Sequence, residues 1–134
     1  MEAIFLEMSC ETQSFKLPKI LRLGGYGCAV LEMKASIEPH LNLADLFLCS
    51  NFTKELILGD VCVPVLRQIP LSPDISLNRA ICNEKFKKMV WIPVTRDNVD
   101  EVQLYICNRQ GVVPSFQSLH LSCTLLFIPH IELL

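Results

Sequence analysis

Apolar and polar residues alternate strictly along the last third of the chain, between Val99 and Ile128. The alternation covers residues 101–106 and residues 119–127, and a period of two is typical of strands with one buried face. The side chains expected to face the core are Val102, Leu104, Ile106, Leu119, Leu121, Cys123, Leu125 and Phe127. Turn-forming residues lie between the two runs, at Asn108-Arg109-Gln110-Gly111. This region is therefore predicted to be an antiparallel hairpin with a structured loop.

Shorter apolar runs earlier in the chain predict six further strands. They cover residues 3–10, 14–17, 26–35, 45–49, 61–67 and 86–94. Pro18 is expected to stop the second of these, and Pro64 places the fifth at a sheet edge, a strand start or a bulge. Residues 51–60 and 71–82 are predicted loops, and Ile37–Asn42 a connector. Because no convincing amphipathic helix is present, about eight antiparallel strands predict an all-β sandwich or barrel.

Composition sets the size and the environment of this fold. With 134 residues the chain forms one domain, residues 1–134, with a single core. Since 51% of residues are hydrophobic and only 19% are charged, some apolar surface is expected to contact another protein. The net charge is -2 and the chain has no basic stripe, which argues against direct nucleic-acid binding. No stretch has the length of a membrane span, and the N-terminus does not resemble a signal peptide.

The cysteines predict a reduced protein made in the cytosol. There are seven, without a C-x-x-C pair, and most lie in strand-like apolar runs. They are Cys10, Cys28, Cys49, Cys62, Cys82, Cys107 and Cys123. Such thiols act as small core residues. A disulfide framework is the alternative, although a core of this size has little need of one.

The chain shows no pattern of residues typical of catalysis, cofactor binding or metal binding. Its histidines lie far apart without partners at ligand spacing: His40, His120 and His130. Asp97, Asp100 and Glu101 are expected in a solvated turn, because they lack the regular spacing of oxygen ligands that a calcium site needs. A calcium site is the alternative. Gly24-Gly25-Tyr26-Gly27 lacks the Lys-Ser/Thr of a phosphate loop and predicts a tight turn.

Several segments, taken in their order along the chain, carry a resemblance to a known family: Phe15-Lys16-Leu17-Pro18-Lys19-Ile20-Leu21-Arg22-Leu23-Gly24-Gly25, Ala29-Val30-Leu31-Glu32-Met33, Val63-Pro64-Val65-Leu66-Arg67-Gln68-Ile69-Pro70, Val102-Gln103-Leu104-Tyr105-Ile106-Cys107-Asn108-Arg109-Gln110-Gly111, Val113-Pro114-Ser115-Phe116 and Leu121-Ser122-Cys123-Thr124-Leu125. Together they resemble the minor capsid, or penton, proteins of Polinton (Maverick) elements and their adintovirus relatives. The chain departs from the family at Gly25-Tyr26-Gly27, where the family has Gly-x-Trp, at the short connector Ile37–Asn42, and at the turn Asn108-Arg109-Gln110, which is acidic in the family.

The resemblance implies a single jelly roll that assembles as a homopentamer at the vertices of an icosahedral shell. It also implies a double jelly-roll major capsid protein as partner, and a protein that is made in the host cytoplasm and resides in the virion. No membrane span and no direct contact with nucleic acid are expected. The family supplies no catalytic, cofactor-binding or metal-binding residue for this chain, which is expected not to be an enzyme.

Two other functions are consistent with a small β-sandwich. A monomeric module that binds a glycan or a peptide would expose Trp91 and Tyr105 in one cleft. An enzyme would need a bound metal, or a pocket that joins His120 to the acids near Asp100.

Overall fold

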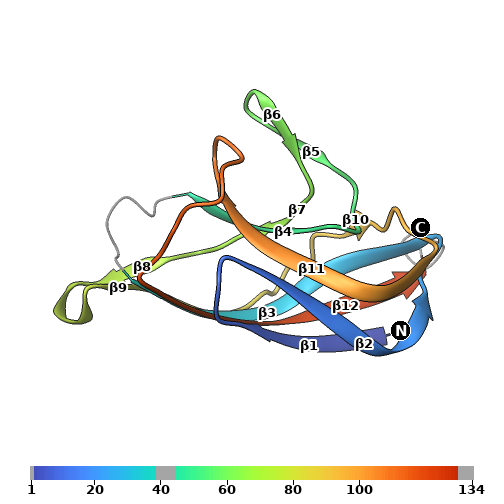
Figure 1. Ribbon diagram of the computed structural model, residues 1–134, viewed down its shortest axis with the longest axis horizontal. Helices are drawn as coiled ribbons and strands as arrows, with labels where there is room; N and C mark the ends of the chain where they lie inside the picture. The colour runs from blue at the N-terminus through green and yellow to red at the C-terminus, as the bar shows by residue number, and fades with distance from the viewer. Residues whose placement is uncertain (1, 39–44, 130–134) are drawn as a thin grey trace.

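The computed structural model describes residues 2–38 and 45–129, which form two antiparallel β-sheets packed face to face (Figure 1). The first sheet has the order β1 (Glu2–Met8), β12 (Ser118–Pro129), β3 (Tyr26–Glu38), β9 (Arg79–Lys85), β8 (Ser72–Asp74), with β10 (Ile92–Pro93) beside β3. The second has the order β2 (Thr12–Arg22), β11 (Asn98–Asn108), β4 (Leu46–Ser50), β7 (Val65–Gln68). The hairpin of β5 (Leu56–Leu58) and β6 (Val61–Val63) forms a separate two-stranded sheet. The prediction of an all-β sandwich is confirmed.

The eight longest strands pair in a nested order. The first of them pairs with the last, β1 with β12, and the second pairs with the seventh, β2 with β11. The third pairs with the sixth, β3 with β9, and the fourth with the fifth, β4 with β7. These pairs alternate between the two sheets. The chain therefore follows the path of one long antiparallel hairpin that is wrapped around a common core.

The inward faces of both sheets share this core. All eight side chains that the alternation predicts to face inward are buried, so the predicted faces of β11 and β12 are confirmed. The rings of Phe52 and Phe127 meet with their centroids 5.8 Å apart. Other fully buried contributors are Met33 and Leu121 from the first sheet and Leu48, Leu66 and Leu104 from the second.

The prediction that β11 and β12 form a hairpin is wrong, because they lie in opposite sheets. Each is already paired on both edges, β11 with β2 and β4, and β12 with β1 and β3. The connection over residues 109–117 crosses between the sheets. Its turn is organised by Asn108, whose Oδ1 accepts hydrogen bonds from the backbone N–H groups of Gln110 and Val112, both at 3.0 Å. Gly111 supplies the positive φ of 79°.

Three of the predicted elements are corrected. Residues 51–60 include β5, residues 71–82 include β8 and part of β9, and the strand predicted at residues 86–94 is reduced to β10. At the start of this last segment, Phe86 and the Lys88 backbone contact Arg67 of β7. The guanidinium of Arg67 lies 3.8 Å from the centre of the Phe86 ring, and its Nη1 donates to the Lys88 carbonyl at 2.9 Å.

The prolines act in two ways. Pro18 does not stop its strand, since β2 continues to Arg22. β2 is an edge strand, where a missing N–H is tolerated, and its register with β11 shifts between Val99 and Glu101. Pro64 separates β6 from β7, so the single strand predicted at residues 61–67 is divided between two sheets. The connector predicted at Ile37–Asn42 begins within β3, and residues 39–44 lie outside the described residues.

The described part of the chain contains a single helical turn, the 3-10 turn Ile75–Leu77, and no helix that is long and apolar enough to cross a membrane.

Candidate functional site

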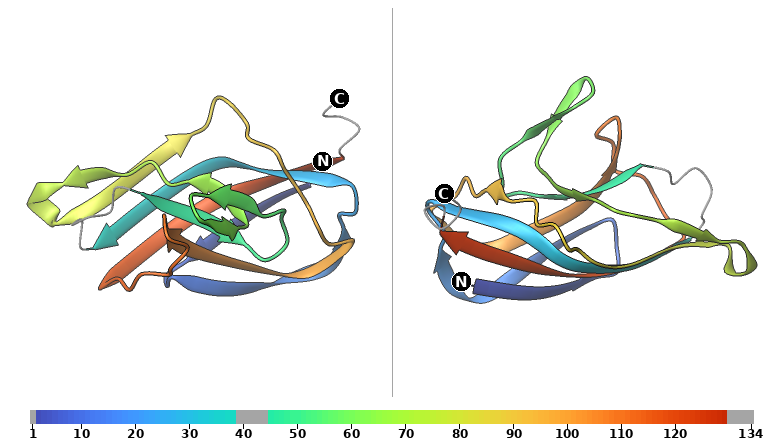
Figure 2. Two further views of the ribbon diagram at one scale, coloured as in Figure 1. Left: turned by 90° about the horizontal axis from the view of Figure 1, so that it is seen from above. Right: turned by 180° about the vertical axis from the view of Figure 1, so that it is seen from behind.

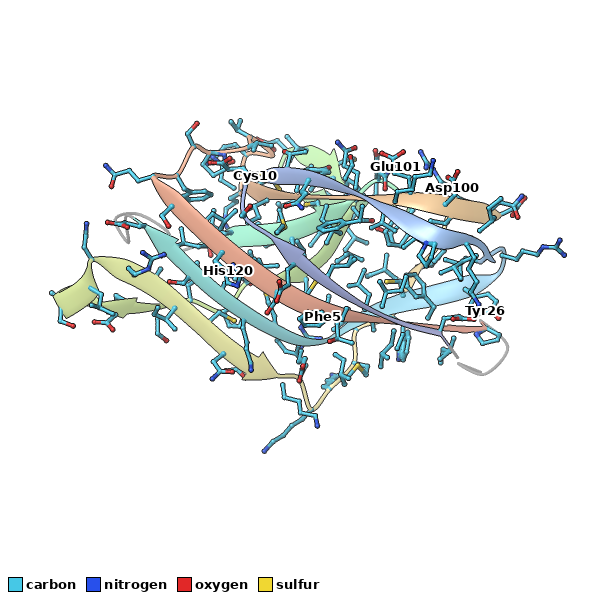
Figure 3. The ribbon with its side chains drawn as sticks, turned by 60° about the horizontal axis from the view of Figure 1, so that its bottom comes forward. Phe5, Cys10, Tyr26, Asp100, Glu101 and His120 are labelled. Atoms are coloured by element: carbon cyan, nitrogen blue, oxygen red, sulfur yellow. The ribbon has the colours of Figure 1, made fainter. Side chains whose placement is uncertain are left out.

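The residues considered for catalysis or metal binding lie apart in the structure (Figure 3). His120 is exposed on β12 of the first sheet, whereas Asp100 and Glu101 are exposed on β11 of the second. His40 and His130 lie outside the described residues. Within residues 2–38 and 45–129, no group of three or more His, Cys, Asp or Glu side chains could hold a metal ion. The structure thus does not bring His120 and the acids near Asp100 into one pocket.

The glycine-rich segment forms a tight turn packed against a neighbouring loop. Gly25 has a φ of 77°, and a Cβ atom at Gly24 would lie 2.8 Å from Asp97 Oδ1. The backbone N–H of Leu23 donates to the Asp97 carbonyl at 2.7 Å. The acidic side chain of Asp97 therefore lies against this turn.

The cysteines are free thiols, and five are buried. Burial raises the pKa of Cys82 to about 11 and that of Cys123 to about 12, so both thiols are protonated at neutral pH. Burial, and then the neighbouring Cys107, raise the pKa of Cys49 even further. The Sγ atoms of Cys49 and Cys107 lie 3.5 Å apart beneath the β5–β6 hairpin. These thiols pack as protonated, apolar side chains, and Cys10 and Cys62 are the exposed ones.

The β5–β6 hairpin is held on the outer face of the second sheet by a small hydrophobic cluster of its own. The cluster consists of Phe47, Cys49, Val63, Val65 and Cys107, with Leu58, Val61 and Tyr105 packed against it. Burial raises the pKa of Tyr105 to about 12. A Cβ atom on Gly111 would lie 3.3 Å from Val61 Cγ2, which shows how closely the 109–117 connection approaches β6. The hairpin is therefore a docked element, and it leaves Ile57 82% exposed.

A cleft of about 670 Å³, lined mostly by residues with polar side chains, lies beside this hairpin. It is lined by Ser50, Asn51, Thr53, Lys54, Glu55, Pro64, Thr95 and Tyr105. Several of its polar groups are already paired within the protein. The hydroxyls of Ser50 and Thr53 are 2.7 Å apart, and Asn51 Oδ1 accepts from the backbone N–H of Gln103 at 3.0 Å. Trp91 is not among the lining residues, so this cleft does not join Trp91 to Tyr105 as a glycan- or peptide-binding module would require.

A second groove, of about 580 Å³, is mainly apolar. This β7 groove is lined by Leu56, Val65, Leu66, Arg67, Gln68, Pro70, Phe86, Val90 and Ile92. Leu56 and Val90 are 38% and 41% exposed, so apolar surface is open to solvent here. Partial burial lowers the pKa of Arg67, which stays cationic at neutral pH. Exposed Lys87 and Lys88 follow Phe86 in the chain.

Large exposed apolar side chains also occur outside this groove. They are Phe5, Ile20, Ile57, Ile75, Leu77, Val112 and Val113. Two of them, Ile75 and Leu77, lie in the 3-10 turn between β8 and β9. The sequence predicts excess apolar surface, but not where it lies. Exposure depends on which segments pack together, and only the folded chain determines that.

Compared with known proteins, the chain matches no protein-family model and no curated protein sequence.

Proposed function

We propose that the protein is a structural viral protein, a minor capsid or penton subunit that forms homopentamers at the vertices of an icosahedral shell. The observation that carries this proposal is the nested pairing of the eight longest strands across two sheets. This pairing is expected of a jelly roll, in which two Greek keys form a double sheet, as in viral capsid domains. It agrees with the sequence resemblance to penton proteins.

The filled interior argues against a ligand site between the two sheets. Jelly rolls also occur in lectins and in cupins. Here the space between the sheets holds fully buried apolar side chains such as Met33, Leu104 and Leu121. The interior therefore serves stability, and the surface is where this protein meets other molecules. We accordingly propose a role in assembly rather than in catalysis.

Exposed apolar side chains supply the second support. Ile75 and Leu77, in one turn, are 80% and 60% exposed, and Val90 in the β7 groove is 41% exposed. Large exposed apolar groups favour contacts with other proteins, and a closed ring of identical subunits covers such surface without open-ended growth. The proposed partners are further copies of the chain and a double jelly-roll major capsid protein, without direct contact to nucleic acid. The protein would be made in the host cytoplasm and reside in the virion.

The solution mass tests this proposal. The purified protein is analysed by light scattering behind size exclusion, alone and with the double jelly-roll major capsid protein from the same source. One chain has a mass of 15.2 kDa, so a pentamer of about 76 kDa separates clearly from a monomer. A five-subunit species under either condition supports the vertex role. A monomer that ignores the shell protein at high concentration contradicts it and favours a monomeric binding module.

A further inference from the structure

The β8–β9 arm, residues 71–80, projects from the sandwich (Figure 2). Ile75 and Leu77 are 80% and 60% exposed. Their turn is well defined, because Asp74 Oδ1 accepts hydrogen bonds from Ser76 Oγ at 2.7 Å and from the Leu77 backbone N–H at 3.4 Å. Asn78 ends the turn with a φ of 53°. The backbone that carries these two apolar side chains is therefore ordered before any partner binds.

The base of the arm is anchored to the first sheet. Arg79 Nη1 forms an ion pair with Glu38 Oε2 at 3.1 Å, and Nη2 donates to Ser118 Oγ at 3.2 Å. Arg79 Nε donates to Ser36 Oγ. These contacts join β9 to β3 and β12, so the direction of the arm is set by the sandwich. The charge of Arg79 is compensated locally, and the tip carries the carboxylate of Asp74.

The β7 groove has the properties that would receive such a tip. Leu56, Phe86 and Val90 offer apolar surface, and Phe86 is fixed because its N–H donates to the Leu31 carbonyl at 2.9 Å. Arg67 lines the groove, and Lys87 and Lys88 follow Phe86. The groove thus combines apolar surface with positive charge, whereas the tip combines apolar side chains with negative charge. The two surfaces are complementary in both respects.

An arm does not fold back into the groove of its own chain. Pro70 lies in the groove, and the chain leaves it through β8, which advances about 3.3 Å per residue. Figure 2 shows the arm extending beyond the rest of the molecule in both views. An arm that docks in the groove must therefore belong to another chain, and a second copy provides a tip of matching chemistry.

We propose that the β8–β9 arm of one copy docks in the β7 groove of the next copy, with Ile75 and Leu77 as anchors. The carboxylate of Asp74 then approaches the cations at Arg67 and Lys88. Because the arm and the groove are different surfaces, this contact is heterologous and produces a closed ring when the rotation between copies permits. The inference rests on the proposed self-assembly and names its contact.

Variants of the two surfaces test this contact by light scattering. Ile75→Asp removes the arm anchor and Val90→Asp places a charge in the groove, and both positions are exposed, so the fold should persist. Each variant should weaken association by about 100-fold, as expected for the loss of a central anchor, and run as a monomer where the wild type is assembled. Ile20→Asp is the matched control, because Ile20 is also exposed but lies on β2. It should assemble like the wild type.

Mixing the two variants makes the test specific. An intact groove from Ile75→Asp can accept an intact arm from Val90→Asp, so the mixture should form pairs of about 30 kDa, twice the 15.2 kDa of one chain, and nothing larger. If the wild type and each variant on its own all form pentamers, the arm contact is overturned but the shell role is left intact. Wild-type oligomers of another size that are lost in both variants would support the contact and contradict the pentamer. A wild type that stays monomeric with the shell protein would overturn both.

Discussion

Replacing Leu104 tests whether the two sheets share one core. Leu104 is fully buried near the middle of β11, and its side chain belongs to the cluster formed by both sheets. Leu104→Ala removes three carbon atoms, worth about 0.8 kcal/mol each in burial, or about 2.4 kcal/mol. The residual cavity adds to this cost, because side chains from both sheets enclose the site and collapse only in part. The expected loss is about 3–4 kcal/mol, a large share of a typical stability of about 5–15 kcal/mol.

A charge at the same position should prevent folding. Leu104→Asp would bury a carboxylate without a partner, and Leu125→Asp would do the same from β12 in the opposite sheet. The assay is urea denaturation followed by circular dichroism, at a protein concentration where every variant is monomeric. Gln103→Ala is the matched control, since the neighbouring Gln103 is only partly buried, and its change should stay within about 0.5 kcal/mol. Soluble aspartate variants with a wild-type midpoint would refute the assignment of the core face.

Three further predictions follow from the backbone and the thiols. Gly111→Ala should cost about 1–2 kcal/mol in urea denaturation, because residue 111 has a φ of 79° and its Cβ would press on β6; an unchanged midpoint would contradict this. A thiol reagent at pH 8 should label Cys10 and Cys62 in the native protein and the buried cysteines only after unfolding, as mass spectrometry can show. Burial raises the pKa values of Cys82 and Cys123 from 9.0 to about 11 and 12. Between these pH values the native state keeps both thiols protonated, whereas the unfolded chain releases their protons. Their contribution to stability is therefore complete below about pH 9 and should be lost as the pH rises to about 12, whereas a flat profile across this range would show that the thiols are not buried.

The alternation of residues predicts the faces of β11 and β12 because burial of one face imposes a period of two. It does not contain the identity of the neighbouring strand, since any strand with a matching apolar face satisfies it. For this reason the two strands are correctly located in the sequence but are wrongly expected to pair. Their true partners come from the first half of the chain.

Other elements differ because local composition conceals their environment. β9 has polar or charged residues at both ends, Arg79 and Lys85, while Ala80 and Cys82 between them are buried. Phe86 and the residues after it have the composition of a strand, yet Phe86 stacks with Arg67 in a connecting segment. The arm and the β7 groove have no signature in the sequence, because they depend on tertiary contacts between distant residues.

Electron microscopy of co-assembled particles tests the central claim most directly. The protein and the double jelly-roll major capsid protein from the same source are expressed together, and the particles are reconstructed with icosahedral symmetry. The shell role predicts that density fitting five copies of this β-sandwich occupies each vertex. Closed shells whose vertices lack this density, with the protein absent from the purified particles, would contradict it.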